Sequence, residues 1–229
     1  GMNVARFNFS HGDHQEHFER IERVRRCSQK LGRPVALMMD TKGPEIRTGN
    51  VLDGKKVTIK SGETVIVTVD DAFVTASTDN QPAHISLNWK ALPKKVSKGV
   101  KILIADGLLE LNVEHTDGIT VTCKATNTAE IGSKKNVNLI GIHAGLPIMS
   151  EQDKKDIEFG AKVGLDFVAA SFVSFASEIH EIRNFLDNLN SPMKIIAKIE
   201  NEEGLDNIEE IVQAADGVMV ARGDLGVQL

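Results

Sequence analysis

The pattern of apolar and polar residues changes twice along the chain, and this change restricts the fold more than any other feature. Residues 4–40 and 150–226 alternate short apolar strands with amphipathic helices, one strand about every 25–30 residues. Between them, from about Asn50 to Leu146, stretches such as "KVTIKSGETVIVTV" alternate apolar and polar residues and are rich in Val, Ile and Thr. That pattern predicts an antiparallel all-β module. The chain is therefore expected to be a parallel β/α scaffold interrupted by an inserted β domain.

The β/α parts carry clear start signals for their helices. Asp13 with Glu16, and Ser150 with Asp153, are spaced as N-terminal caps. Strands are predicted at 4–9, 35–40, 166–172, 193–200 and 217–226, and helices at 13–31, 150–164, 176–189 and 204–215. The first helix is expected to bury the apolar stripe Phe18, Ile21, Val24, Cys27 and Leu31.

Composition excludes several classes of protein. The 229 residues carry a net charge of −5 and no basic stripe, which argues against nucleic acid as the partner. No apolar run approaches the roughly 18 residues that span a bilayer. Cys27 and Cys123 sit in no C-x-x-C pattern, so we expect neither a disulfide framework nor a zinc knuckle, and a cytoplasmic setting. Both ends of the chain resemble cuts within a longer protein.

Unusual polar residues lie at the carboxyl ends of the predicted strands. In parallel β/α folds, and above all in the (β/α)₈ barrel, that end carries the active site. One such strand would mean little, but four predict a shared site. The residues are Asn8, Ser10 and His11 after the first strand, Asp40 and Thr41 after the second, Lys198 and Glu200 in "KIIAKIE", and Arg222 and Asp224 in "VMVARGD".

Residue types suggest the chemistry of that site. Lys198 and Glu200 share one face of their strand, and they form either a structural ion pair or a site that holds an anion and a cation. Glu200 and Asp224 are hard oxygen donors of the kind that hold magnesium. Lys198, Arg6 and Arg47 suit a phosphate, since phosphoryl transfer needs a metal and cationic clamps. The common nucleotide-binding motifs are missing.

Five blocks of the chain resemble the signature blocks of pyruvate kinase, in the right order. They are "GMNVARFNFSHG", "MMDTKGPEIRTG", "DFVAASF", "AKIENEEG" and "GVMVARGDLGV". The resemblance implies a partial (β/α)₈ TIM barrel in residues 1–48 and 147–229, interrupted by an inserted all-β barrel lid domain in residues 49–146. It also implies that this chain covers the central part of that barrel.

The resemblance implies transfer of a phosphoryl group from phosphoenolpyruvate to ADP, giving pyruvate and ATP, in a cytoplasmic homotetramer with magnesium and potassium. Lys198, Arg6 and Arg47 would be catalytic, and Lys198→Met would cut the rate by orders of magnitude with little change in stability. The other implied sites are Arg6, Lys198, Ala221, Arg222 and Gly223 for substrate, Arg47, His11 and Lys135 for nucleotide, Glu200 and Asp224 for magnesium, and Asn8, Ser10, Asp40 and Thr41 for potassium.

Two alternatives stay open. One is a metal-dependent pyruvate or phosphoenolpyruvate aldolase or lyase barrel, which also uses a Glu/Asp pair but is disfavoured by the long insertion. The other is a fragment that turns nothing over by itself. The chain also departs from the family: Ser174 and Phe175 replace a common basic pair, and Ile140 replaces a common proline. His11, His14 and His17 are spaced like metal ligands but are expected to face solvent.

Overall fold

The computed structural model describes residues 1–142 and 144–228. They divide into two compact units, which we call the β/α unit (Gly1–Pro44 and Leu146–Val227) and the β unit (Glu45–Gly145). The resemblance had put the insertion at residues 49–146. Each unit is described by itself.

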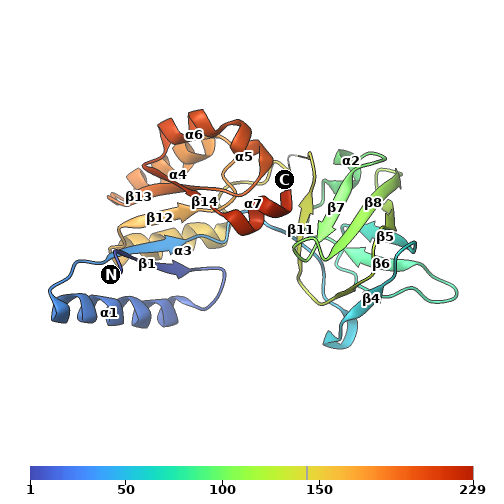
Figure 1. Ribbon diagram of the computed structural model, residues 1–229, viewed down its shortest axis with the longest axis horizontal. Coiled ribbons are helices and arrows are strands. Elements are labelled where there is room, and N and C mark those ends of the chain that lie inside the picture. Colours follow the sequence, from blue (N-terminus) through green and yellow to red (C-terminus); the bar gives the residue numbers. More distant parts are fainter. Residues whose placement is uncertain (143, 229) are drawn as a thin grey trace. The chain divides into compact units, whose positions relative to one another are not determined.

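The β/α unit is built on a parallel sheet, as predicted. Its strands β1, β2, β12, β13 and β14 lie side by side in that order (Figure 1). Every pair is parallel, and the register runs from Asn8 opposite Asp40 in the first pair to Ile199 opposite Val220 in the last. The strands span Val4–Asn8, Ala36–Asp40, Phe167–Ala170, Lys194–Ile199 and Gly217–Val220.

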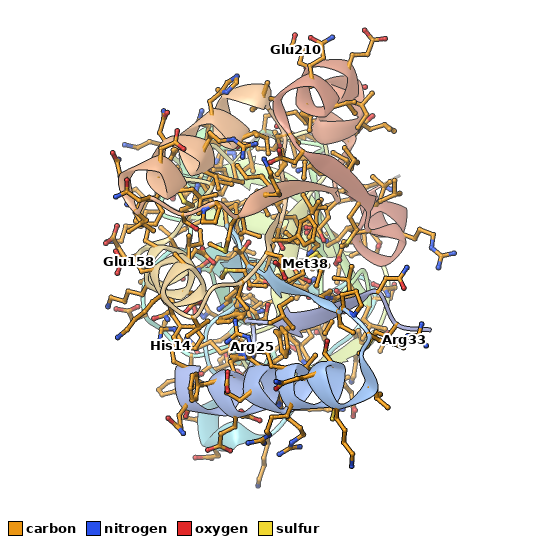
Figure 2. The ribbon with its side chains drawn as sticks, turned by 90° about the vertical axis from the view of Figure 1, so that its left-hand side faces the viewer. His14, Arg25, Arg33, Met38, Glu158 and Glu210 are labelled. Atoms are coloured by element: carbon orange, nitrogen blue, oxygen red, sulfur yellow. The ribbon has the colours of Figure 1, made fainter. Side chains whose placement is uncertain are left out.

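Helices connect these strands, and the predicted caps begin two of them. Asp13 accepts a hydrogen bond from the Glu16 N–H at 2.9 Å, and Ser150 and Asp153 form a reciprocal capping box. Side chains of α1 also contact α3 and the turn after it: His14 bonds Asp156 on α3, and Arg25 donates to the Gly164 carbonyl. Figure 2 labels His14 and Arg25 on α1. The helices are α1 (His14–Leu31), α3 (Glu151–Lys162), α4 (Ala176–Asn188), α5 (Glu202–Asp206), α6 (Ile208–Ala214) and α7 (Arg222–Gln228).

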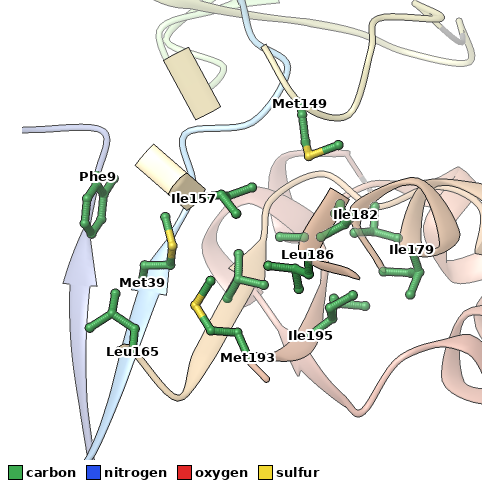
Figure 3. Packing of buried hydrophobic residues seen from close by; sticks show 14 of the residues in the cluster. Phe9, Met39, Met149, Ile157, Leu165, Ile179, Ile182, Leu186, Met193 and Ile195 are labelled. Carbon is green, nitrogen blue, oxygen red and sulfur yellow. The ribbon is translucent and has the colours of Figure 1, made fainter. Parts of the chain in front are cut away.

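The core of the β/α unit lies on one face of the sheet. Alternate side chains of β1, β2, β12 and β13 enter it, such as Met39 on β2 and Ile195 on β13. The helices α3 and α4 supply Ile157, Ile182 and Leu186 to the same cluster (Figure 3). The residues between, at even numbers on β1, β2 and β13, face the other side of the sheet.

The buried face of α1 differs from the prediction. Ile21 is fully buried, but Phe18 and Leu31 are 42% and 70% exposed. His17 is buried instead, so the expectation that it faces solvent was wrong. Its ring stacks on Phe9 at 4.0 Å between centroids, and its Nε2 donates to the His11 carbonyl at 2.8 Å. The stripe is centred on His17 and Ile21, one turn apart.

Two elements have other bounds in the structure than the sequence predicted. The single helix expected at 204–215 is two helices, broken at Asn207, whose side chain donates to the Ser174 and Glu203 carbonyls. The last strand ends at Val220, so "ARGD" does not continue it. The Ala221 N–H still bonds Ile199, but the Ala221 carbonyl accepts from the Leu225 N–H and begins α7.

The β unit is a mostly antiparallel sheet with its own core, and the ends of its first and last strands are joined by a bridge between Thr48 and Leu87. Its seven-stranded sheet has the order β3-β11-β7-β8-β9-β5-β6, and β10 pairs with β4. The pair β5–β6 is parallel, because the long connection between them carries the chain back to the same end. The strands are β3 (Ile46–Arg47), β4 (Val57–Ile59), β5 (Thr64–Thr68), β6 (Ala83–Ser86), β7 (Lys101–Ile104), β8 (Leu109–Thr116), β9 (Val121–Ala125), β10 (Ala129–Ile131) and β11 (Asn136–Leu139), with the short helices η1 (Leu52–Gly54) and α2 (Leu92–Lys95).

Within the described part of the chain, no helix is both long enough and apolar enough to cross a membrane.

Candidate functional site

The sheet face opposite the core carries the predicted polar side chains. Arg6 and Asn8 on β1, Asp40 on β2 and Lys198 on β13 alternate with the core residues of their strands. The parallel register sets Asn8 directly opposite Asp40. The carboxyl ends of these strands therefore bring together residues that are as far apart in the sequence as Arg6 and Lys198.

Lys198 lies at the centre of this group and is 8% exposed. Its Nζ contacts Asp40 Oδ1 at 2.9 Å and Glu200 Oε1 at 3.0 Å, and it donates to Ser171 Oγ at 2.7 Å. An ammonium has three N–H donors, so these partners use all of them. The other oxygen of Asp40 accepts from Arg6 Nε at 2.9 Å.

The chain after β12 contributes residues that the sequence pattern had not singled out. Ser171 is 3% exposed and donates its hydroxyl to the Thr41 carbonyl at 2.7 Å. The N–H of Phe172 donates to Glu200 Oε2 at 2.7 Å. Phe172 has φ 59°, a left-handed conformation that is uncommon outside glycine. Nothing in "AASF" signals this role, because it depends on the chain turning at the mouth of the sheet.

Burial and charge both act on the ion pair. Burial raises the pKa of Glu200 despite Lys198 beside it, and the nearby negative charge of Asp224 adds to the rise. For Lys198 burial by itself would lower the pKa, but Glu200 and Asp40 outweigh it and raise the pKa. Around this pair, the carboxylates of Asp40, Glu200 and Asp224 outnumber the cations Lys198 and Arg6. The site is therefore electronegative and suited to a further cation.

The predicted residues on the last segment lie at the start of α7. Ala221 follows β14 directly, Arg222 and Gly223 are exposed, and Asp224 is half-buried in the first turn. A Cβ added at Gly223 would meet nothing within 4 Å. The Asp224 carboxylate is near enough to influence Glu200 through its charge.

The four residues predicted to hold potassium lie at the ends of β1 and β2. Asn8 Oδ1 accepts from the Ser10 N–H at 3.0 Å. Asp40 and Thr41 are buried, and Thr41 Oγ1 accepts from the Ser171 N–H at 3.2 Å. His11 follows this group, with its side chain exposed.

Two predicted site residues belong to the β unit. Arg47 is held within that unit, since its Nε donates to Glu45 Oε2 and its Nη1 to the Lys134 carbonyl, each at 2.7 Å. Lys135 is exposed, and its N–H donates to Thr48 Oγ1 at 2.9 Å. Arg47 also lines a cavity of about 180 Å³ in this unit, together with Asp70.

Among the described residues, no three His, Cys, Asp or Glu side chains are grouped closely enough to hold a metal ion between them. His14 pairs with Asp156 at 2.6 Å and stacks on Phe159 at 4.4 Å, while His17 is enclosed against Phe9. The predicted magnesium pair, Glu200 and Asp224, is a two-carboxylate set, as is usual when substrate and water complete the coordination.

Comparison with known proteins decides the family. The pyruvate kinase barrel-domain family matches residues 1–229. Pyruvate kinases from Geobacillus stearothermophilus and Staphylococcus aureus (strain MRSA252) are 47% and 45% identical to this chain over its full length. A crystal structure of a pyruvate kinase from Cryptosporidium parvum superimposes with a TM-score of 0.93 at 40% identity, covering 100% of this chain and 47% of that one. This chain belongs to the pyruvate kinase family.

The chain spans 38% of the length of those two bacterial pyruvate kinases. The family relationship accounts for both the β/α pattern and the all-β pattern of the sequence, because the matched barrel-domain region includes the β unit.

The residues present fit the cations that pyruvate kinases typically use. Glu200 and Asp224 offer carboxylate oxygens, and the raised pKa of Glu200 reflects burial and a repulsion that a divalent cation would relieve. Asn8, Ser10, Asp40 and Thr41 offer only oxygen donors, which suits potassium. Asp40 is already bonded to Arg6 and Lys198, so a potassium ion there would share its charge.

Proposed function

We propose that the protein containing this chain transfers the phosphoryl group of phosphoenolpyruvate to ADP, giving pyruvate and ATP. The observation that carries the proposal is the buried ammonium of Lys198 between Asp40 and Glu200, at the carboxyl ends of strands in a chain of this family. Magnesium, potassium, a homotetrameric assembly and a cytoplasmic location belong to the same proposal.

Each residue would act through charge and position. Lys198 would stabilise the negative charge of the moving phosphoryl group, and Arg6 would contact the phosphate. Glu200 and Asp224 would hold the magnesium ion, which when bound supplies positive charge to phosphate oxygens. Asn8, Ser10, Asp40 and Thr41 would hold potassium.

Other residues would bind substrate and nucleotide. Ala221, Arg222 and Gly223 would present their backbone to the substrate carboxylate, with the Arg222 and Gly223 N–H groups at the helix start as the donors, since the Ala221 N–H bonds Ile199. Arg47 and Lys135 of the β unit and His11 of the β/α unit would bind the nucleotide. The β unit would act as a lid that excludes water and strengthens every charge contact.

Replacing Lys198 tests the proposal. In the full-length protein, Lys198→Met should lower kcat for ATP formation by about 100- to 1000-fold or more, because it removes a charge that acts on the transition state. A coupled assay of pyruvate formation, started with ADP, measures this. Lys194→Met is the matched control: it lies on the same strand but at its other end, with a side chain that is 61% exposed.

The structure changes the expectation about stability. Lys198→Met would leave Asp40 and Glu200 buried with one cation fewer, so it should also destabilise the protein, by about 3–5 kcal/mol if the carboxylates stay charged. Turnover must therefore be measured at a temperature where melting curves show the variant folded. A wild-type protein that forms no ATP from phosphoenolpyruvate and ADP, or a folded Lys198→Met variant with normal kcat, would contradict the proposal.

A further inference from the structure

The ammonium of Lys198 has to be fixed in place without losing its charge. Two of its three partners, Asp40 and Glu200, are carboxylates that neutralise it. Both are also shared: Asp40 with Arg6, and Glu200 with the cation that it would hold under the proposed function. The third partner, Ser171 Oγ, is the shortest contact at 2.7 Å and carries no charge.

The hydrogen bonds around Ser171 orient its hydroxyl toward Lys198. Its one proton is donated to the Thr41 carbonyl at 2.7 Å, and the possible contact to Asp40 Oδ1 is longer, at 3.3 Å. The oxygen is therefore left as an acceptor for the ammonium. The Ser171 N–H bonds Thr41 Oγ1, so the backbone is held as well.

The backbone around Ser171 has an uncommon conformation and leaves room for its side chain. Phe172 adopts a left-handed conformation, and its N–H donates to Glu200, so consecutive residues hold the two members of the ion pair. Such a conformation costs free energy and persists at sites where the surroundings require it. Gly43 leaves the space that Ser171 needs, since a Cβ at Gly43 would lie 2.8 Å from the Ser171 Cβ.

We propose that Ser171 is a positioning residue for Lys198, a neutral acceptor that keeps the ammonium at the phosphoryl-binding point when its carboxylate partners are occupied elsewhere. The inference rests on the proposed function. Ser171 would not touch the reacting atoms. Its loss would lower the rate through misplacement of Lys198, and misplacement by about 1 Å can cost about 100-fold.

The test compares Ser171→Ala, Ser171→Cys and Ser171→Thr in the full-length protein. Ser171→Ala removes the acceptor, Ser171→Cys keeps the approximate size with a much weaker one, and Ser171→Thr keeps the hydroxyl. We expect kcat to fall about 10- to 100-fold for Ala and Cys and to recover at least partly for Thr. The KM for phosphoenolpyruvate, and the Kd for Mn²⁺ measured without substrate, should change less than about threefold.

Ser174→Ala is the matched control. Ser174 lies in the same loop and is equally buried at 4%, but its hydroxyl accepts from Asn201 and has no contact with Lys198. Its kcat should stay within about threefold of wild type. A purely structural role for Ser171 would instead move melting temperature and KM together with kcat.

Crystal structures of the wild type and Ser171→Cys give a readout that does not depend on turnover. Lys198 Nζ should move away from residue 171 in the variant. A folded Ala or Cys variant with kcat near wild type, or an unmoved Nζ, overturns the inference. If Ser171→Ala does not fold, the kcat and the Nζ position of Ser171→Cys provide the test. If the wild type forms no ATP but Nζ moves, the proposed function fails and the positioning role of Ser171 stands.

Discussion

At the scale of single residues, the site is a buried cluster with too few cations. Lys198 contacts both Asp40 and Glu200, while Arg6 contacts Asp40 and keeps half of its side chain in solvent. Buried ion pairs rarely add much stability, because desolvation offsets the attraction. A cluster of this kind is better explained by what it binds than by the stability that it contributes.

Cys123 shows how burial alone changes a side chain's chemistry. Burial, with the negative charge of Glu114 nearby, raises the pKa of the Cys123 thiol to about 12. The thiolate is the reactive form, so almost none is present near neutral pH.

We therefore predict that Cys123 in the folded, full-length protein resists alkylation at pH 8 and reacts on unfolding. Peptide mapping by mass spectrometry after a timed iodoacetamide pulse measures this, with the exposed Cys27 as the internal reference. Equal labelling rates at the two positions under native conditions would contradict the burial of Cys123.

At the scale of elements, the two ends of the strands in the β/α unit differ. Their carboxyl ends carry the candidate site, and their amino ends carry side-chain contacts that join neighbouring strands. At the amino ends, Asp166 before β12 accepts from the Leu37 N–H at 2.7 Å, and Asp216 before β14 accepts from the Ile195 N–H at 2.8 Å. Each aspartate also donates its own N–H to the carbonyl of the same partner residue. The same pair of hydrogen bonds thus joins β2 to β12 and β13 to β14.

Asp216→Ala should destabilise the protein by about 1–3 kcal/mol, because it leaves the Ile195 N–H unpartnered and removes the ion pair with Arg183. Chemical unfolding monitored by circular dichroism measures the loss. Asp187→Ala, at an exposed position on α4, should change stability by less than about 0.5 kcal/mol.

The contribution of Asp216 to the stability of the protein should depend on pH. Partial burial by itself would raise the pKa of Asp216, but the Ile195 N–H and the Arg183 guanidinium outweigh it and hold the pKa below 3.8. A lowered folded-state pKa means that this stabilisation is complete above pH 3.8 and is lost as pH falls through the folded value. The difference in unfolding free energy between wild type and Asp216→Ala should therefore become smaller below pH 3.8. If this difference stays constant down to pH 3, the charged carboxylate is not its source.

At the scale of the whole molecule, the β unit is an insertion that could fold independently. Its ends meet within its own sheet, because β3 near the start pairs with β11 near the end. Its interior holds fully buried side chains from several strands, such as Val65, Ile104 and Leu111. A closed pairing of the ends and a separate core are what a domain of this size needs to be stable alone.

We predict that a peptide of residues 45–145 unfolds in one cooperative transition, with a β-rich circular dichroism spectrum. Within it, Leu111→Ala should cost about 2–5 kcal/mol through the cavity it leaves. Ile119→Ala, at a position that is 75% exposed, should cost less than about 0.5 kcal/mol. A broad, non-cooperative melt would show that the unit depends on the rest of the protein.

The sequence by itself determined the features that depend on local spacing. The alternation of strands and helices, the caps at Asp13 and Ser150, and the face shared by Lys198 and Glu200 all follow from the periods of the helix and strand and from short-range hydrogen bonds. The position of polar residues at strand ends was enough to predict that these side chains would lie together.

Only the tertiary structure decided the features that depend on which distant residue comes opposite. Ser171 looks like any serine after a strand, and its role exists because β12 lies between β2 and β13. His17 is buried because Phe9 covers it, and Asn207 breaks a helix because the Ser174 carbonyl is within its reach. These outcomes follow from contacts between different elements of the fold, and the pattern within one element carries no information about such contacts.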